Sequence, residues 1–428
     1  MSPVYNKIIL DNGLKIIAHR MPRMQSLSLG IWIKAGGRYE NSANKGAAHF
    51  LEHLLFKGTK KYSCRQLKES IEGIGGSLNG FTSEELTCYL VKIPAIYSAR
   101  ALNLLSDMVI NPTLPPLEIK KEKAVILEEL KMYQDLPQSY VYELLDELLW
   151  PKQPLGLPII GTIDSINRIG RKGLALFKEE YYTASNMVIS AAGELDVRKL
   201  EDAVAKIFSR LPKKGDNIFL KVKEAQDGIR LKVFYKDTEQ THMALGFRGF
   251  KRDHPLRHAL ELLHIILGAN MSSRLFNELR EKRGLAYEIG TMVRRFYDTG
   301  AFLVHVGIDN RKVYNAIPLI LKELNKTKDN LVSNDEFKRA KEFYIGQLKL
   351  GLEDTMEHML WIGETTATLD RTYSLNEIIT EVNSVKRDDI RQVARYLFKE
   401  SNLNLSLIGP LKGAEAKIRK QLVLLVAQ

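Results

Sequence analysis

Cysteine is scarce in this sequence of 428 residues, which contains only Cys64 and Cys88. Two cysteines are too few for a disulfide framework, and they cannot form a zinc site made of thiolates alone. We therefore expect two reduced thiols without special chemistry, as is usual for proteins of a reducing compartment.

Long apolar runs are missing as well. No stretch approaches the roughly 20 apolar residues that a helix needs to cross a bilayer. The first residues, Met1 to Tyr5, show neither the basic and apolar regions of a signal peptide nor an arginine-rich transit pattern. The sequence thus predicts a cytoplasmic protein without membrane insertion.

Acidic residues are outnumbered by basic ones, with 63 Lys and Arg against 51 Asp and Glu and a net charge of +12. The charges are scattered, and stretches such as 118–123 mix both signs. No nucleic-acid-binding motif accompanies them, so we expect a solvated surface and no nucleic-acid partner. A basic nucleic-acid-binding module is a weaker alternative, which requires tight binding that falls steeply with salt.

The chain repeats itself at a constant separation of 216 positions. Residues 166–195 match 382–411, and Leu29-Gly30 recurs as Leu245-Gly246 inside a second alternating apolar run. Matches in the same order predict two related domains of ordinary size. We place the N-terminal domain at 1–212, a linker at 213–228 and the C-terminal domain at 229–428.

Each copy reads as strands and helices in the same order. Alternation of apolar residues indicates strands, and a spacing of three and four indicates helices. Antiparallel strands with helices on one face form an α+β sandwich in each half. In the first copy we expect a hairpin at 7–19 that turns at 11–13, strands at 27–34, 86–93 and 187–192, and helices at 44–56 and 117–133.

The helix expected at 44–56 carries the order His-x-x-Glu-His, with His49, Glu52 and His53. Residues four apart share a helix face, so both imidazoles can reach one metal ion. Glu52 is close enough to activate a water molecule at that ion, which is the chemistry of inverted zinc-peptidase helices. The alternative is two unrelated histidines on a helix surface.

A third ligand is expected from the helix at 117–133. At about 100° per residue, Glu122, Val125, Ile126 and Glu129 fall within one arc that should face the core. An unpaired buried carboxylate is costly, and coordination of a metal or a hydrogen bond to a ligand offsets that cost. We assign Glu129 as the third zinc ligand and Glu122 as a supporting residue behind the ligands, whereas Glu128 points to solvent. The alternative is a structural pair of glutamates.

On residues 46–59 and 122–129, the chain resembles the inverted-zincin, pitrilysin-like metallopeptidases, and in particular the mitochondrial and bacterial processing peptidases of the beta type. The resemblance covers essentially the whole chain, including residues 272–287. It implies one zinc ion per chain and a half-clamshell, two of which enclose a chamber for unfolded peptides, a peptidasome. The second copy places Leu260, Leu263 and His264 where the first has its motif, so His264 is not expected to bind zinc.

The glycine-rich stretch 75–82 contains Asn79, Gly80, Phe81 and Thr82 and precedes an expected strand. Glycines let a substrate backbone approach closely. The resemblance implies that this stretch lies beside the zinc site, where a peptide adds to the sheet edge as an extra strand. Many family members have Ala where this chain has Gly80, and a plain hairpin loop is the alternative reading.

The resemblance also implies a role for Arg280 and Tyr287 in the second copy. In the family, an Arg and a Tyr seven residues apart complete the active site of the facing half. This chain carries both the zinc motif and the pair, which predicts a homodimer with active sites completed in trans. The predicted activity is zinc-dependent endopeptidase cleavage of short or unfolded peptides, and the alternative is a non-catalytic scaffold subunit like the respiratory-complex core proteins.

Overall fold

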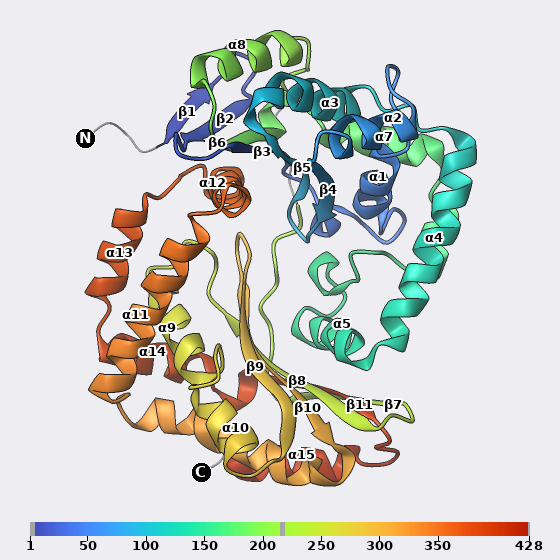
Figure 1. Cartoon of the computed structure of the whole chain (residues 1–428). Coiled ribbons are helices and arrows are strands. Elements are labelled where there is room, and N and C mark those ends of the chain that lie inside the picture. The colour runs from blue at the N-terminus through green and yellow to red at the C-terminus, as the bar shows by residue number, and fades with distance from the viewer. Residues whose placement is uncertain (1–4, 215–218, 427–428) are drawn as a thin grey trace. The chain divides into compact units, whose positions relative to one another are not determined.

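The computed structural model describes residues 5–214 and 219–426, and the chain forms two compact units (Figure 1). Each unit holds one β-sheet with helices packed on it, so the predicted α+β fold with two related sandwich domains is confirmed. Unit 1 contains Met1–Leu130, Pro158–Leu220 and Leu348–Leu375, and unit 2 contains Lys131–Leu157, Lys221–Gln347 and Asn376–Gln428.

The sheet of unit 1 has six strands in the order β1-β2-β6-β3-β5-β4. All neighbours are antiparallel except β2 and β6, which are parallel. The expected hairpin is present, and its turn depends on Gly13, whose φ of +85° is the left-handed region that favours glycine. The strands are β1 (Asn6–Ile9), β2 (Lys15–Arg20), β3 (Ser26–Ile33), β4 (Ser77–Thr82), β5 (Thr87–Pro94) and β6 (Met187–Gly193).

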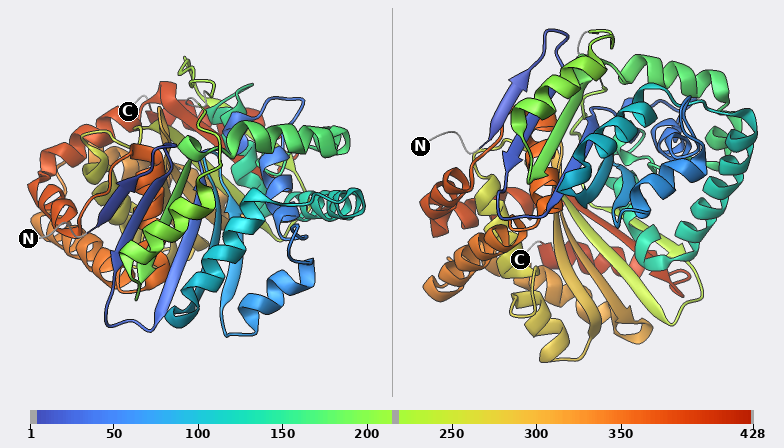
Figure 2. Two further views of the ribbon diagram at one scale, coloured as in Figure 1. Left: turned by 90° about the horizontal axis from the view of Figure 1, so that it is seen from above. Right: turned by 45° about the horizontal axis from the view of Figure 1, so that its top comes forward.

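Helices cover one face of this sheet more fully than the other. The larger core of unit 1 joins α1, α3, α7 and α8 to residues of β2 and β3 such as Ile16 and Leu29, and α3 and α8 lie over this face when it is seen from above (Figure 2). The helices of unit 1 are α1 (Ala47–Leu55), α2 (Cys64–Glu72), α3 (Ser98–Ile110), α4 (Pro116–Asp135, through residue 130), α6 (Ile163–Arg168), α7 (Arg171–Tyr181), α8 (Val197–Phe208) and α12 (Thr355–Leu369).

Unit 2 repeats the pattern with five strands in the order β7-β11-β8-β10-β9. Here β7 and β11 are parallel and the other neighbours antiparallel, as for β2 and β6 in unit 1. The strands are β7 (Arg230–Tyr235), β8 (Gln240–Gly249), β9 (Ala286–Arg295), β10 (Gly300–Asp309) and β11 (Leu403–Gly409). The helices are α5 (Pro137–Leu149), α9 (Arg257–Leu267), α10 (Val313–Asp329), α11 (Asn334–Gly351), α13 (Leu375–Ser384), α14 (Arg387–Leu397) and α15 (Glu415–Val426), where α11 belongs to unit 2 through residue 347 and α13 from residue 376.

Two equivalent helices are exchanged between the halves of the sequence. Helix α12 comes from the second half but packs on β2, β3 and β6, where Gly30 and Gly363 allow close contact with Met359 and Trp32. Helix α5 comes from the first half and packs on β8 and β11. Each covers the second face of its sheet, whereas the sequence predicted helices on one face only.

This exchange makes the compact units differ from the predicted ranges 1–212 and 229–428. Segment 131–157 belongs to unit 2 and segment 348–375 to unit 1. Of the expected linker 213–228, residues 215–218 lie outside the described residues, and 219–228 contain no helix or strand. In the described parts of the chain, none of the helices combines the length and the apolar character that crossing a membrane requires.

Candidate metal centre

Helix α1 presents His49, Glu52 and His53 from a helix that is otherwise buried. Phe50, Leu51 and Leu54 are fully buried in the core of unit 1, which fixes the rotation of the helix about its axis. The two imidazoles, one turn apart, have ring centroids 4.6 Å from each other. The burial of the apolar residues thus places both imidazoles side by side.

The start of α1 is held by a buried carboxylate that the sequence analysis did not single out. Glu40 accepts hydrogen bonds from the backbone N–H groups of Gly46 (2.9 Å) and Ala48 (2.7 Å). Gly46 has φ +94°, and a Cβ there would come within 2.7 Å of the carbonyl oxygen of Ile160. An acceptor at the first turn stabilises a helix and fixes its start one turn before His49.

Glu129 of α4 faces both histidines. Its Oε1 lies 3.9 Å from Nε2 of His49, and its Oε2 lies 3.7 Å from Nε2 of His53. One ligand atom from each of the three residues lies within 4.8 Å of the others. The structure thus brings together the three residues assigned as zinc ligands, on two helices that lie about 75 residues apart in the sequence.

The donor set suits a zinc ion. Burial, together with the neighbouring His53, lowers the pKa of His49 to about 3, so this imidazole is neutral and has a free lone pair. Its Nδ1 atom is buried and has no hydrogen-bond partner among the described residues. Burial raises the pKa of Glu129, a cost that a bound cation offsets. Two imidazoles and one carboxylate would be three protein ligands, the number with which a catalytic zinc ion keeps a further position for water.

Glu122 lies behind this group, on the buried face of α4. Its Oε2 is 3.2 Å from Nδ1 of His53, and its Oε1 is 2.6 Å from Nζ of Lys57. A carboxylate at one ring nitrogen holds the proton there and leaves Nε2 of His53 free to bind a metal. The sequence analysis missed Lys57, which lies just beyond the end of α1. Its position four residues after His53 was the available signal.

Glu52 points toward the strand β4. Its Oε2 accepts a hydrogen bond of 3.0 Å from the hydroxyl of Thr82. Burial is the main cause that raises the pKa of Glu52, and the hydrogen bond from Thr82 opposes it. A partly buried carboxylate beside the histidines, with its pKa raised, is suited to exchange a proton with a neighbouring water molecule.

The rotation of α4 is close to the predicted one, with one departure. Ile126 is fully buried, Glu122 is 6% exposed, Glu129 is partly buried and Glu128 is exposed, as expected. Val125 was expected on the core side, but it is 49% exposed. The buried residues of α4 are Ile119, Glu122, Ile126 and Leu130. Val125 lies at the edge of this buried face and stays accessible to solvent.

Residues 77–82 are a strand and not a loop that precedes one, which corrects the sequence interpretation. In β4, alternate residues face opposite sides, with Gly80 and Thr82 toward α1 and its end, and Asn79 and Phe81 exposed. A Cβ at Gly80 would come within 3.1 Å of the ring of Phe56. β4 pairs with β5 and ends the sheet, so its other edge makes no strand pairing with the described residues.

Among its described residues, the second copy contains no comparable group. His49, His53 and Glu129 are the only set of three metal-binding side chains found among the described residues. His264 of α9 has its Nδ1 atom 2.6 Å from the hydroxyl of Thr291, so its ring is engaged in unit 2 by a neighbouring strand. His264 is thus a half-buried histidine held by a contact within unit 2.

Arg280 and Tyr287 lie next to each other in unit 2. Arg280 belongs to the short π-helix Phe276–Glu281, and Tyr287 stands near the start of β9. The guanidinium carbon is 5.4 Å from the centre of the Tyr287 ring, and this tyrosine is 74% exposed. The structure thus makes them one exposed pair in unit 2, whereas the metal-binding group belongs to unit 1.

Two family models match the chain. The model described as Insulinase (Peptidase family M16) matches residues 15–163, and the model described as Peptidase M16 inactive domain matches residues 168–344. The first match contains all the residues of the candidate metal centre, and the second contains Arg280 and Tyr287.

Curated relatives match over nearly their full length. A Bacillus subtilis protein named uncharacterized zinc protease YmxG is 36% identical over 400 residues, which are 94% of this chain and 97% of the relative. A Streptomyces coelicolor protein, also named uncharacterized zinc protease, is 33% identical over 413 residues, which are 95% of this chain and 90% of the relative.

A solved structure shares the fold. The crystal structure of a protease from Helicobacter pylori matches with a TM-score of 0.90 and 24% identity, and it covers 95% of this chain and all of the other.

Proposed function

The chain belongs to peptidase family M16, and from this premise we propose that it is a zinc-dependent endopeptidase that cleaves short or unfolded peptides. The proposal rests on one observation: His49, His53 and Glu129 lie close enough together to bind one metal ion, and Glu52 lies beside them. We propose one zinc ion per chain, held by these three residues.

In the proposed mechanism, the zinc ion acts as a Lewis acid and Glu52 transfers the proton. When bound, a zinc ion supplies Lewis-acid chemistry, which lowers the pKa of water and polarises a carbonyl group. Glu52 accepts the proton of the attacking water at its carboxylate and then passes it to the nitrogen of the leaving amine. The hydroxyl of Thr82 fixes one oxygen of this carboxylate during the transfer. The reaction consumes one water and yields a carboxylate and an amine.

The peptide is proposed to bind along β4. The free edge of this strand offers backbone groups that an extended peptide can pair with, independent of its sequence. Because Gly80 has no side chain, β4 can lie close to the ring of Phe56. The hydroxyl of Thr82 connects the strand to Glu52 by a hydrogen bond. A substrate strand paired at 79–82 would therefore place its backbone beside the proton acceptor.

We further propose that the enzyme is a homodimer of the processing-peptidase type, in which Arg280 and Tyr287 of one copy complete the site of the other. A guanidinium can fix a substrate carbonyl, and a phenol can donate to a developing oxyanion. The exposure of Tyr287 and its proximity to Arg280 support a shared role toward a substrate.

Digestion of a peptide library, read by mass spectrometry, tests the proposal. The wild-type protein should cleave internal peptide bonds, and cleavage should stop with a chelator and return with zinc. The Glu52→Gln variant is the matched control for contaminating peptidases. Zinc binding without any cleavage would instead support a non-catalytic scaffold, and absence of zinc would refute the proposal.

A further inference from the structure

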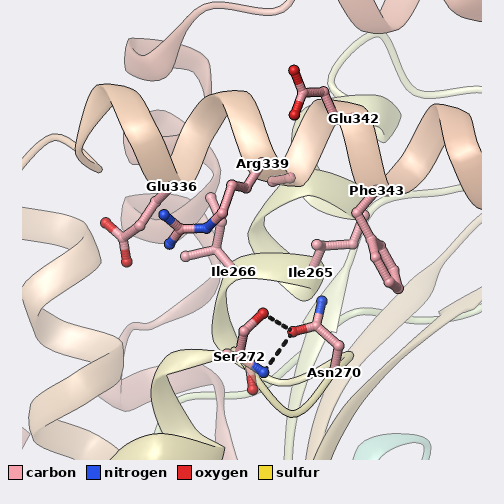
Figure 3. A pocket seen from close by; sticks show the side chains of 10 residues that line it. Ile265, Ile266, Asn270, Ser272, Glu336, Arg339, Glu342 and Phe343 are labelled. Atoms are coloured by element: carbon pink, nitrogen blue, oxygen red, sulfur yellow. Dashed lines mark hydrogen bonds between the residues drawn. The ribbon is translucent and has the colours of Figure 1, made fainter.

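Unit 2 contains a pocket of about 250 Å³ between α9 and α11 (Figure 3). Its walls come from the end of α9, the loop that follows, and the middle of α11. Ligand pockets for drug-sized molecules usually exceed about 300 Å³, so this volume suits a smaller group, such as a single amino-acid residue.

One side of the pocket is apolar. Ile265 and Ile266 of α9 and Phe343 of α11 line it, and the isoleucines are each 5% exposed. Figure 3 shows Phe343 extending from α11 toward the side of the loop that holds Asn270. This surface is suited to a branched or aromatic side chain, whose transfer from water is favourable.

Three residues that line the pocket, Asn270, Ser273 and Arg339, have a hydrogen-bond donor without a partner among the described residues. The hydroxyl of Ser273 is buried, with 3% of the residue exposed, and has no partner among the described residues. Asn270 accepts hydrogen bonds at its Oδ1 from the backbone N–H and the hydroxyl of Ser272 (3.1 and 2.8 Å). The backbone donor fixes the orientation of the amide, so the NH₂ group of Asn270 points away from Ser272, toward α11 (Figure 3).

Arg339 adds a positive charge. Within the described parts of the chain its guanidinium makes no hydrogen bond or ion pair. The two nearby carboxylates are engaged elsewhere, because Glu336 pairs with Arg274 at 2.8 Å and Glu342 lies 3.9 Å from Lys338 and points away from Asn270 (Figure 3). An anionic acceptor such as a carboxylate matches the chemistry of these donors, which all line the one pocket.

We propose that this pocket binds the C-terminal residue of a peptide, with its carboxylate on Arg339, Ser273 and Asn270 and its apolar side chain on Ile265, Ile266 and Phe343. The chemistry of the pocket specifies an apolar residue with a free carboxylate. The choice of a peptide as its source rests on the proposed function, since cleavage both consumes and releases such termini.

Calorimetric titration of the full-length Glu52→Gln protein tests the proposal without hydrolysis. The probes are N-acetyl-Ala-Ala-Leu with a free carboxylate, its C-terminal amide, and free leucine. Binding along β4 uses backbone groups that the acid and the amide share. We therefore expect one additional site per chain, where the acid binds at least about tenfold more tightly than the amide, because a hydrogen bond to a charged group is worth that factor. Free leucine should bind more weakly than the peptide acid because its ammonium group lies beside Arg339.

Variants locate the site. Arg339→Gln should weaken binding of the acid about tenfold, whereas Lys349→Gln, on the same helix but outside the pocket, should leave it unchanged. Ser273→Ala should weaken binding about fivefold without lowering the thermal midpoint, because its hydroxyl has no partner in the free protein. Binding should persist after zinc is removed.

Several results would overturn the assignment. Equal binding of acid and amide, or unchanged binding by Arg339→Gln, would show that no carboxylate is held there. Loss of binding on zinc removal would place the peptide at the metal instead. Free leucine as strong as the peptide acid would make the pocket a small-molecule site, and absence of saturable binding would refute it. A protein without peptidase activity can still give the expected result, so failure of the proposed function is distinguishable.

Discussion

The Nδ1 atom of His53 lies 3.2 Å from a carboxylate oxygen of Glu122, on the side of the ring opposite Glu129. Glu122 is in turn held by Lys57 at 2.6 Å. This chain of contacts fixes the orientation of the imidazole and directs Nε2 toward Glu129. The orientation of this metal-binding histidine is therefore set by residues that would not themselves bind the metal.

Glu122→Gln should weaken zinc binding by about 10- to 100-fold, the range found when an outer carboxylate is removed from a metal-binding histidine. Competition with a chromophoric chelator measures this affinity. Glu128→Gln, on the exposed face of α4, is the matched control and should bind zinc like the wild type. Equal affinity of the Glu122 and Glu128 variants would mean that Glu122 has only a structural role.

Glu129→Gln should lose most of its zinc during purification, because the amide removes the only anionic ligand of the group. Elemental analysis of the purified protein checks this, with Glu128→Gln again retaining about one zinc per chain. The opposite pattern, zinc lost from the Glu128 variant and kept by the Glu129 variant, would contradict the assignment of the third ligand.

Glu52→Gln should keep its zinc and lose nearly all turnover, because an amide cannot accept the proton of the attacking water. Removal of a general base typically costs about 10²- to 10⁴-fold in rate. Steady-state kinetics on one cleaved peptide, combined with metal analysis, tests both parts. Turnover within a factor of about three of the wild type would exclude this role for Glu52.

Mixing two inactive variants tests the homodimer. A Glu52→Gln chain and an Arg280→Ala/Tyr287→Phe chain should regain activity together, because one site of the mixed dimer then has an intact base and an intact pair. The expected maximum is about one quarter of wild-type activity, since half of the dimers are mixed and each has one complete site. If the variants demonstrably exchange subunits and stay inactive, the sites are not completed in trans.

A pH-dependent loss of stability is expected from Glu143 of α5. Burial, assisted by the charge of Asp146, raises its pKa from 4.5 to about 7. The folded state then binds more protons than the unfolded state between these pH values, so the free energy of unfolding falls as the pH rises from about 4.5 to 7. Below this window the effect is absent.

Glu143→Gln should therefore be more stable than the wild type at pH 8, by about 1 to 3 kcal/mol, and should differ little at pH 4.5. Urea unfolding at both pH values measures the difference. Glu147→Gln is the matched control, because this residue lies one turn further along α5 and pairs with Lys232 at the surface. Its effect should stay within about 0.5 kcal/mol. Equal stability of wild type and Glu143→Gln at pH 8 would contradict the raised pKa.

Local patterns determined much of this protein. His49, Glu52 and His53 lie within one helical turn and a half, so their common face follows from helix geometry alone. The hairpin that turns at Gly13 and the repeat at 216 positions are likewise read from the sequence, because turn chemistry and apolar periodicity act over short distances.

Only the tertiary structure decided which residues from different elements come into contact. The approach of Glu129 to the histidines, of Glu122 to His53 and of Thr82 to Glu52 depends on how α1, α4 and β4 pack, and no local rule specifies that packing. The exchange of α5 and α12 was invisible in the sequence because the apolar face of a helix does not specify which of two related sheets it packs on. The exposure of Val125 likewise depends on which residues of α4 the neighbouring elements cover. Burial is a property of the whole assembly of elements, and periodicity within one helix only narrows it to a face.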